Sequence, residues 1–562
     1  MQSIDTDVVI VGGGPAGLML AIELGCRGVS CVLIEENRDE PAFPKANATS
    51  ARTMEHYRRR GFANEVRALG LTADHPQDVV YCTRLAGTEL ARFRIPSRQD
   101  AVKHRSFGDY GEAAWPTPEL PHRGQQMFIE PVLRRQVARY PSVTARYGWH
   151  ATAVQTHTDH AEVEVTPPDG ATPHVLRCRY VVGCDGPRSL VRKSMGARYS
   201  GTSQEAREFF GGQMLSVHFS SPDLYDVLGK EKAWQYWAVN DEQRCLLVAI
   251  NGIDTFMLCI QLLPGQSADA VDYRRAAQLA VGAPFTLNVI ATAPWLAGYM
   301  LVADRFQSGR ALIAGDAAHL FTPSGGMGYN TSVDDAVNLG WKLAAVLQGW
   351  APEALLRSYE AERQPIAQRN TRFARAMADS IGCIVVPPFL EHASPQGEAD
   401  RRTLGDALAM HVQREFNIPG LQLGLSYWGS PIVLAEPNQV VIDEPNRYQP
   451  SGSPGGRAPH VWLGKQSLLD RFGLDFTLLC FDGSDTSVWR CAAEQLGMPL
   501  TVVHIDHPKA RALYGADCVL IRPDHHISWR GSAGDDILQV LRCAVGHSLG
   551  AEHQTGETIA QA

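Results

Sequence analysis

Three glycines near the N-terminus, Gly12, Gly14 and Gly17, are spaced as GxGxxG after an apolar run and before a helix-like one. The first glycine of this pattern permits a tight turn, the second lets backbone N–H groups approach a pyrophosphate, and the third allows close packing of helix on sheet. Glu35 ends the next apolar run, where a carboxylate can accept hydrogen bonds from ribose hydroxyls. The spacing therefore predicts a dinucleotide site. Its expected residues are Gly12, Gly14, Pro15, Ala16, Gly17 and Glu35.

Later motifs carry further chemistry. Residues 310–319 read RALIAGDAAH, so a strand ends at Gly315-Asp316 and places a carboxylate where ribose or ribityl hydroxyls can be bound. In the glycine-rich stretch 323–330, PSGGMGYN, the backbone can lie against a flat ring beside the start of the next helix. Another strand ends in Asp185-Gly186, whose acid either contacts a cofactor or only closes an Asx turn. Together these motifs favour FAD over NAD.

The elements that position these motifs begin with a strand at 7–12, a helix after it, and a strand at 31–35. Alternating residues predict strands within 151–166, and the run 180–186 predicts a buried strand that ends in a turn. Helical spacing returns from 333 to about 380. The pattern predicts an α/β fold with a Rossmann-type FAD-binding domain.

Residues 205–300 read mainly as strands with little helical period, which predicts an antiparallel sheet inserted into the flavin domain. The Pro-, Gly- and Ser-rich segment 445–459 predicts a linker, and the apolar runs beyond it predict a small α/β domain. The expected boundaries are 1–75, 106–195 and 300–385 for the FAD-binding domain, 76–105 and 196–299 for a substrate-binding sheet, 386–445 for a helical or extended connection, and 446–562 for the C-terminal domain.

With these motifs in this order, the chain resembles the single-component flavin aromatic hydroxylases, the family of p-hydroxybenzoate hydroxylase, and more closely its phenol hydroxylase branch. The resemblance covers nearly the whole chain and implies a C-terminal thioredoxin-like domain, here without CxxC. It implies FAD-dependent hydroxylation of a phenolic compound with O2 and NADPH or NADH, through a flavin C4a-hydroperoxide. A tailoring hydroxylase of a polycyclic or polyketide phenol would have the same motifs and is an alternative enzyme function. A non-catalytic flavin-binding protein is an alternative from a different functional class.

The resemblance also implies roles for single residues. Asp316 would bind the ribityl chain, and Asn330 would meet the pyrimidine edge of the isoalloxazine. Lys45 stands where the family usually has an arginine near the pyrophosphate, and Arg52 is either a further contact or a helix-surface charge. Asp185 would serve both FAD and NAD(P)H. The residues added to the expected FAD site are Lys45, Arg52, Gln126, Asp185, Gly186, Gly315, Asp316, Pro323, Gly325, Gly326, Met327, Gly328, Tyr329 and Asn330.

The substrate side is less sharply defined by the sequence. Pro323 is expected beside the reactive flavin edge, so Tyr329 and Met327 either border the substrate pocket or pack in the core. The loop acid Asp109, close to Tyr110 and Glu112, can face the pocket and take the phenol proton. His319 is expected to orient the preceding loop. The expected catalytic residues are Pro323, Tyr329 and Asp109, and the expected substrate contacts are Asn47, Trp234, Tyr236 and Met327, with Trp237 as a further candidate.

Bulk composition restricts the partners. With 52 Lys and Arg against 60 Asp and Glu, the net charge of −8 provides no basic face for nucleic acid or acidic lipid. No apolar run is long enough to span a membrane, and the N-terminus enters a strand directly, so we expect a cytoplasmic protein. The twelve cysteines lack CxxC spacing, which argues against a metal or dithiol site. The expected partners are a small aromatic substrate, O2, NAD(P)H and a second copy of the chain.

Overall fold

A mostly parallel sheet forms the first domain of the computed structural model, which describes residues 4–104, 114–203, 209, 212–262, 265–481, 483, 485–532 and 535–550. Its strands run in the order β16-β17-β8-β1-β2-β5, and the hairpin β6–β7 continues from β8. Parallel pairs join β5, β2, β1, β8 and β17, the arrangement of a doubly wound dinucleotide fold. The strands are β1 (Thr6–Val11), β2 (Cys31–Glu35), β5 (Val143–Tyr147), β6 (His150–Thr156), β7 (Ala161–Thr166), β8 (His174–Gly183), β16 (Gln307–Ser308) and β17 (Ala311–Ile313).

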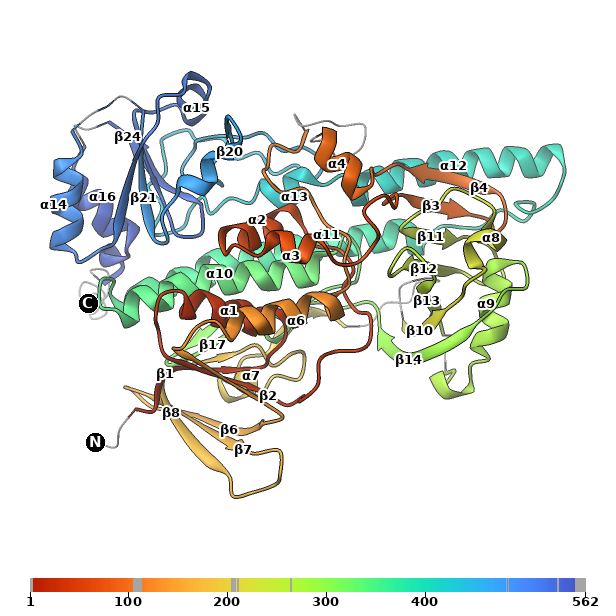
Figure 1. Cartoon of the computed structure of the whole chain (residues 1–562), viewed down its shortest axis with the longest axis horizontal. Helices are drawn as coiled ribbons and strands as arrows, with labels where there is room; N and C mark the ends of the chain where they lie inside the picture. Colours follow the sequence, from red (N-terminus) through yellow and green to blue (C-terminus); the bar gives the residue numbers. More distant parts are fainter. Residues whose placement is uncertain are drawn as a thin grey trace, which may run out of the picture.

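Helices cover one face of this sheet, with α1 and α6 nearest to the strands and α10 packed against α1 (Figure 1). The helix α1 is buried almost all round because it lies between the sheet and α10. The helices of this domain are α1 (Pro15–Gly25), α2 (Ala51–Arg59), α3 (Ala63–Arg67), α6 (Gln126–Val137), α7 (Leu190–Ser194), α10 (Met327–Leu347) and α11 (Arg357–Gly382).

The second sheet has the order β14-β10-β13-β12-β11-β3-β4. It is antiparallel except where β3, from an earlier part of the chain, pairs in parallel with β11. The sequence predicted little helix here, but α9 is a helix between an Asp272 cap and a left-handed Gly282; its buried face is mostly alanine, which gives a weak periodic signal. The elements are β3 (Val79–Cys82), β4 (Glu89–Phe93), α4 (Arg98–His104), β10 (Gln213–Ser220), α8 (Leu224–Leu228), β11 (Gln235–Ala238), β12 (Cys245–Ala249), β13 (Thr255–Gln261), α9 (Tyr273–Val281) and β14 (Asn288–Leu296).

The two faces of this sheet have different neighbours. On the outer face, Tyr225 of α8 packs edge-on against Phe256 at 5.1 Å. On the inner face, Ser216 and Trp237 lie in one row across the paired strands, and His218 is two residues further along β10. The His218 ring lies 6.2 Å from that of Phe43, in the flavin-domain segment after β2. The inner face is therefore turned toward the flavin domain.

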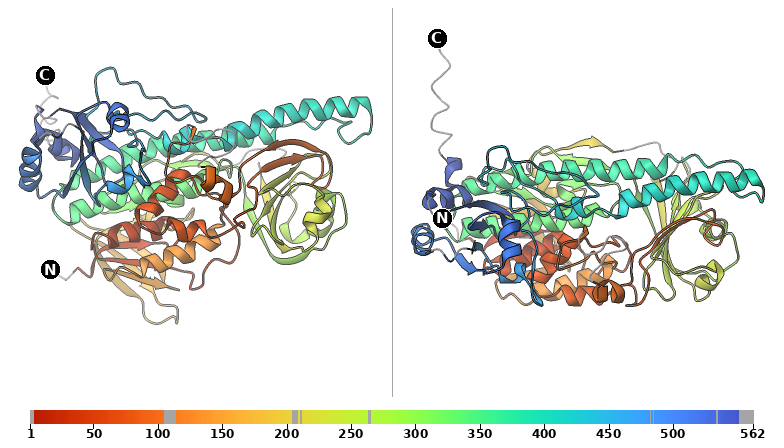
Figure 2. Two further views of the ribbon diagram at one scale, coloured as in Figure 1. Left: turned by 45° about the horizontal axis from the view of Figure 1, so that its top comes forward. Right: turned by 90° about the horizontal axis from the view of Figure 1, so that it is seen from above.

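Two long helices tie the domains together. After α11 the chain forms α12, which packs on both α11 and β4 and extends beyond the second sheet (Figures 1 and 2). A small sheet joins the flavin domain to the start of the second sheet, in the order β18-β15-β9. These elements are β9 (Tyr199–Thr202), β15 (Met300–Ala303), β18 (His319–Leu320), α12 (Pro395–Phe416) and α13 (Pro419–Leu423).

The C-terminal domain is a four-stranded sheet in the order β22-β21-β23-β24 with flanking helices, a thioredoxin-like arrangement. It packs against the flavin domain near α10 (Figure 2). None of the helices in the described part of the chain has the length and hydropathy needed to cross a membrane. The elements are β19 (Trp462–Leu463), β20 (Gln466–Ser467), β21 (Phe476–Cys480), α14 (Ser487–Gln495), β22 (Leu500–His504), α15 (Pro508–Tyr514), β23 (Cys518–Ile521), β24 (Ile527–Gly531) and α16 (Ile537–Ala544).

Candidate active site

The three glycines after β1 serve different purposes. Gly12 has a φ of +104°, and a Cβ there would lie 2.2 Å from the carbonyl oxygen of Cys184. A Cβ on Gly17 would lie 1.9 Å from the carbonyl oxygen of Gly12. Gly14, in contrast, has ordinary extended backbone, and no protein atom lies within 4 Å of the place of its Cβ. The protein itself does not need a glycine at this position, so the open space before α1 fits a phosphate group.

Glu35 closes the same turn. One of its carboxylate oxygens accepts a hydrogen bond from the Gly13 N–H at 2.6 Å, and the other accepts two from Asn37 at 2.7 and 2.8 Å. A carboxylate has about four lone-pair sites, so acceptor capacity remains for ribose hydroxyls. The geometry fits the expected adenosine end of FAD.

Asp316 lies in a turn, Gly315–Ala317, immediately after β17. Its side chain is exposed, and no hydrogen bond from a described residue reaches its carboxylate. The surrounding protein nevertheless raises the pKa of this carboxyl by desolvation, while the charges of His319 and Lys45 lower it. Solvent therefore reaches the carboxylate although much of the space around it is filled by protein. An open carboxylate there fits a ligand with hydroxyl groups.

Two layers of protein hold this turn in place. The Arg192 guanidinium donates to the Ala317 carbonyl at 3.1 Å and lies 3.8 Å over the ring of Tyr199, whose hydroxyl donates to the Asp316 carbonyl. Behind it, the fully buried Asp335 accepts from the Gly315 N–H at 3.1 Å and is 2.5 Å from His319 Nε2. His319 therefore holds the turn, which is the orienting role expected for it.

The glycine-rich loop leads into α10. Gly325 and Gly326 both have a φ of +65°, and a Cβ on Gly325 would lie 2.9 Å from the ring of Phe373. The Gly325 N–H donates to a carboxylate oxygen of Glu415, on α12, at 2.9 Å. Gly328 meets only ordinary contacts. The loop backbone thus lies close to other protein groups at Gly325 and Gly326, beside the N-terminus of a long helix whose positive end favours a flat anionic ring system.

Asn330 fastens this loop to the segment before α2. Its amide oxygen accepts from the Ser50 N–H at 2.7 Å and from the Thr53 hydroxyl at 2.8 Å. Its amide nitrogen donates to the carbonyls of Ala48 and Gly326. The side chain expected at the pyrimidine edge of the flavin is thus bound to protein groups, and it joins two cofactor-binding segments.

Met327 and Tyr329 pack into the protein. Met327 is buried with Phe321 and Phe373 in a small apolar cluster beside α13, and Tyr329 shares a short hydrogen bond with the hydroxyl of Tyr57 on α2. Both side chains contact other protein groups, with Met327 buried and Tyr329 half-buried, and their expected contacts with the flavin and the substrate stay predictions. Pro323 is exposed at the start of the loop.

Lys45, Asn47 and Gln126 were also expected near the cofactor. Desolvation raises the pKa of both Asp316 and Glu130, and the nearby positive charge of Lys45 opposes that rise at each carboxyl. Gln126 is held by its own N–H, which donates to the Ala46 carbonyl at 2.8 Å, and its amide contacts Glu130. Asn47 is half-buried in the same segment. Gln126 and Lys45 thus lie near Glu130, Lys45 also lies near Asp316, and the expected contacts of these residues with FAD stay predictions.

Asp185 serves the fold. Its carboxylate accepts from the Ser189 hydroxyl at 2.5 Å and from the Leu190 N–H at 2.6 Å, which caps the start of α7. These hydrogen bonds form the expected strand-end turn, and the contact of Asp185 with FAD and NAD(P)H stays a prediction. Gly186 follows with a φ of +74° and has no protein atom near the place of a Cβ.

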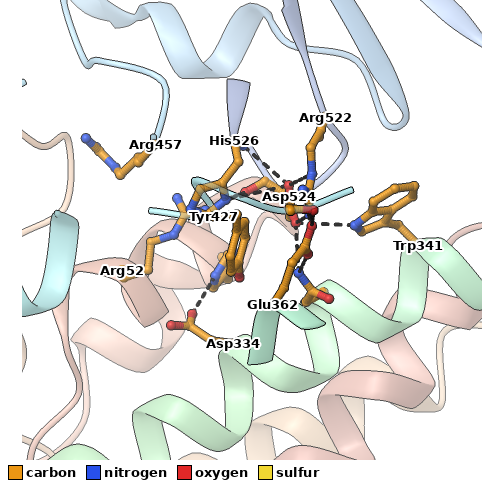
Figure 3. Close-up of polar contacts among 12 residues, drawn as sticks. Arg52, Asp334, Trp341, Glu362, Tyr427, Arg457, Arg522, Asp524 and His526 are labelled. Atoms are coloured by element: carbon orange, nitrogen blue, oxygen red, sulfur yellow. Dashed lines mark hydrogen bonds and ion pairs between the residues drawn. The ribbon is translucent and has the colours of Figure 1, made fainter. Parts of the chain in front are cut away.

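Neither role expected for Arg52 describes its position. Its buried guanidinium donates to Glu55 at 2.9 Å and to the carbonyl oxygen of Asp524 in the C-terminal domain (Figure 3). The side chain is paired at a domain interface and is neither a cofactor contact nor a surface charge. Sequence reasoning missed this because the partner is far along the chain.

Glu362 is the centre of the same interface (Figure 3). It accepts from Arg522 at 2.6 and 2.8 Å and from Lys342 at 2.6 Å, and all three side chains are fully buried. These cations hold the pKa of Glu362 at about 2 despite its burial. The pKa of Lys342 is also lowered, to about 8, because desolvation outweighs its share of one carboxylate. A polar cavity of about 10 Å³ between the domains has room for roughly one water molecule.

The predicted substrate contacts on β11 need correction. Tyr236 points to the face opposite to Trp237, and its hydroxyl accepts from the Ala233 N–H at 2.7 Å. Trp234 is buried between Phe416 and the guanidinium of Arg123, 4.2 Å from the ring. Trp237 is on the inner face, although the sequence offered it only as a further candidate. Asp109, Tyr110 and Glu112 lie outside the described residues.

The turn of the β6–β7 hairpin brings His157, His160 and Glu162 within reach of one metal ion, a group that sequence spacing did not indicate. Glu162 is 2.6 Å from a nitrogen of Arg177, which competes for its carboxylate.

Comparison with known proteins agrees with this geometry. A family model described as an FAD binding domain matches residues 5–374, and one described as the C-terminal part of aromatic-ring hydroxylases matches 451–551. A 4-methyl-5-nitrocatechol 5-monooxygenase from a Burkholderia species is 31% identical over 94% of each chain. Phenol 2-monooxygenase from Pseudomonas sp. (strain EST1001) is 29% identical over 94% of this chain and 90% of its own.

Solved structures are similar over almost the whole chain. RebC, a rebeccamycin biosynthetic enzyme solved with reduced flavin, superimposes with a TM-score of 0.86 at 31% identity, over 97% of this chain and 100% of RebC. A ternary complex of aklavinone-11 hydroxylase with FAD and aklavinone gives a TM-score of 0.79 at 27% identity, with the same coverage. The two family models match in the expected order, and the relatives are similar over almost their full length. These findings identify the family of the chain. The chain belongs to the single-component, FAD-dependent aromatic-ring hydroxylases.

Proposed function

We propose that this protein is an NAD(P)H-dependent monooxygenase that converts a phenolic ring, O2, NAD(P)H and a proton into the hydroxylated ring, water and NAD(P)+. The observation that carries the proposal is that no side chain fills the space at Gly14 and that no described residue donates a hydrogen bond to the exposed carboxylate of Asp316. Bound FAD supplies the electron storage and oxygen activation that side chains lack. The residues around FAD would bind the cofactor, place the substrate and keep water away.

The residues present fit this cofactor in order along its length. The turn at Gly12–Gly17 and the N-terminus of α1 would hold the pyrophosphate, and Glu35 would hold the adenosine ribose. Asp316, with Lys45 and Gln126 beside it, would hold the ribityl chain. The backbone of 325–328 would lie along the isoalloxazine, near the positive end of α10.

The substrate would lie between the glycine-rich loop and the inner face of the second sheet. The seam is apolar, since Phe43, Ala48, Met127 and Phe128 of the flavin domain all pack against the core of that sheet. Apolar walls keep water away from the reacting ring and strengthen any hydrogen bond made inside. An aromatic ring is the ligand class that such a seam fits.

NADH or NADPH would be bound only transiently, since the sequence has no second GxGxxG fingerprint after a strand. A larger, polycyclic phenol is the second candidate substrate. The similarity to RebC and to a complex that contains aklavinone favours it, whereas phenol 2-monooxygenase favours a single ring. We also propose that the protein is a cytoplasmic homodimer. Light scattering of the purified protein would test the dimeric state.

The deciding experiment follows NAD(P)H oxidation and O2 uptake by the purified FAD-loaded protein with mono-, di- and polycyclic phenols. Hydroxylated product and hydrogen peroxide are quantified together, with NADH and NADPH compared. We expect at least one phenol to accelerate oxidation and to yield about one hydroxylated product per NAD(P)H. Acceleration that produces only peroxide, or no response to any phenol, would contradict the proposal.

A further inference from the structure

Three buried polar atoms without a hydrogen-bond partner lie where α12 meets β3. They are the hydroxyl of Tyr81, Nε2 of His411 and the outer carboxylate oxygen of Glu415, and no described residue donates to or accepts from them. The residues are only 0%, 3% and 3% exposed. Buried polar groups are normally paired, so three together indicate an additional binding partner at this place.

Glu415 links this group to the glycine-rich loop. Its inner oxygen accepts from the Gly325 N–H at 2.9 Å, so the carboxylate lies directly beside the segment expected along the flavin ring. Its outer oxygen is 2.9 Å from His411 Nε2, but the two are not aligned for a hydrogen bond. The other ring nitrogen of His411 contacts the Ser380 hydroxyl at 3.0 Å. Both side chains are therefore fixed, and the outer oxygen of Glu415 keeps its acceptor capacity.

Tyr81 approaches from the sheet. Its ring stacks on Trp237 at 5.7 Å and meets the His411 ring edge-on at 6.1 Å, which places it on the inner face (Figure 1 shows α12 along β3 and β4). Burial, together with the nearby negative charge of Glu415, raises the pKa of Tyr81 well above its ordinary value. The hydroxyl therefore keeps its proton and can donate.

The chemistry of the three groups selects their ligand. Tyr81 offers a donor, and the outer oxygen of Glu415 can accept a hydrogen bond in addition to its contact with His411 Nε2, so a group that both accepts and donates satisfies them. A ring hydroxyl does so, while a methyl ether only accepts. A carboxylate only accepts as well, and it would be repelled by the charge of Glu415.

We propose that Tyr81 and Glu415 bind a hydroxyl group of the aromatic substrate, with Tyr81 donating to its oxygen and Glu415 accepting its proton in a hydrogen bond. His411 is a positioning residue that holds Glu415. The assignment rests on the proposed function and specifies its substrate class as un-ionised phenols. Sites that bind a substrate hydroxyl in this way discriminate strongly against analogues that lack it.

The test compares phenol, catechol, 1-naphthol and 1-hydroxyanthraquinone, each with its O-methyl ether, on the FAD-loaded enzyme. Binding is measured from the change in the visible flavin spectrum, and kcat/KM from product formation. The variants are Tyr81→Phe and Glu415→Gln, which keeps an acceptor for Gly325, with Tyr225→Phe on the outer face as the matched control. The preference for phenol over ether is a ratio within one variant, so a general loss of stability cancels.

We expect the wild type and Tyr225→Phe to prefer a phenol to its ether by at least about tenfold. Tyr81→Phe and Glu415→Gln should each lose most of that preference. A preference unchanged in Tyr81→Phe and Glu415→Gln would overturn the assignment and leave water as the partner of these atoms. That result would leave the proposed function intact. If no compound binds or accelerates NAD(P)H oxidation in the wild type, the proposed function itself fails.

Discussion

At the scale of single residues, Gly14 and Asp316 are two open positions of the proposed cofactor site. Around Gly14 the protein leaves space that no side chain fills, and around Asp316 it leaves a carboxylate that no described residue binds. Neither feature contributes to the stability of the protein alone. Substitutions at these positions therefore separate cofactor binding from folding.

Gly14→Ala is expected to lower FAD affinity while the cofactor-free protein keeps its Tm. Its backbone is acceptable to alanine, and no protein atom lies within 4 Å of the new Cβ. A methyl group in the phosphate space costs roughly 1–3 kcal/mol, about tenfold or more in Kd. Titration of the apoprotein with FAD and thermal unfolding without FAD measure the two effects. Unchanged FAD affinity would show that the pyrophosphate binds elsewhere.

Asp316→Asn is expected to weaken FAD binding as well, because the amide loses the charge that strengthens hydrogen bonds from ribityl hydroxyls. Such bonds to charged groups contribute about 1.5–3 kcal/mol, so the Kd should rise by about tenfold or more. The ratio of flavin to protein absorbance after dialysis provides the measurement. Asp226→Asn, on the exposed side of α8, is the control, and equal FAD retention by both variants would contradict the role of Asp316.

At the scale of elements, the inner face of the second sheet determines which aromatic side chains can reach the substrate. Successive residues of a strand point to opposite faces, so Trp237 is inside when Tyr236 is outside. The sequence marks both residues as aromatic strand positions, and the pairing with neighbouring strands decides between them. The contact between α12 and the glycine-rich loop likewise depends on the packing of elements.

Tyr236→Phe is expected to leave KM within about twofold of the wild type and to lower the free energy of unfolding. The buried Ala233 N–H loses its acceptor, which costs about 1–3 kcal/mol. Steady-state kinetics with the preferred phenol and urea unfolding measure the two quantities. A tenfold rise in KM with unchanged stability would contradict this prediction and indicate that Tyr236 contacts the substrate.

At the scale of the whole molecule, buried ion pairs join the C-terminal domain to the flavin domain. Arg522 and Asp524 come from the C-terminal domain, and Glu362, Lys342 and Trp341 come from α10 and α11. Breaking one partner of a buried charge pair leaves the other uncompensated, which costs roughly 3–5 kcal/mol. The C-terminal domain is thus part of the scaffold that holds α10, the helix whose N-terminus is proposed to lie near the flavin.

Glu362→Gln is expected to lower the Tm at pH 7 and to flatten the dependence of Tm on acid pH. The pKa of Glu362 is about 2 in the folded protein, below its ordinary value of 4.5. Its stabilisation is therefore fully present above about pH 4.5 and is lost as the pH falls toward 2. Calorimetry from pH 7 to pH 3 compares this variant with Glu494→Gln, an exposed glutamate of α14. Parallel curves for both variants would show that the interface does not depend on this charge.

The sequence by itself determined the cofactor, the family and the order of the domains. GxGxxG, the Gly315-Asp316 turn and the glycine-rich loop are local patterns, and each requires only that a strand ends and a helix begins within a few residues. The strands β10 to β13 were equally visible because their apolar runs are strong. Local spacing therefore specifies the flavin chemistry.

The tertiary structure decided which side chains surround that chemistry. Arg52 pairs with Asp524, Glu415 reaches Gly325, and Tyr236 turns away from Trp237. Each of these facts depends on strand register or on helices that meet across long sequence separations. Periodicity identifies a buried face but not its partner, because the partner is selected by the packing of the complete chain.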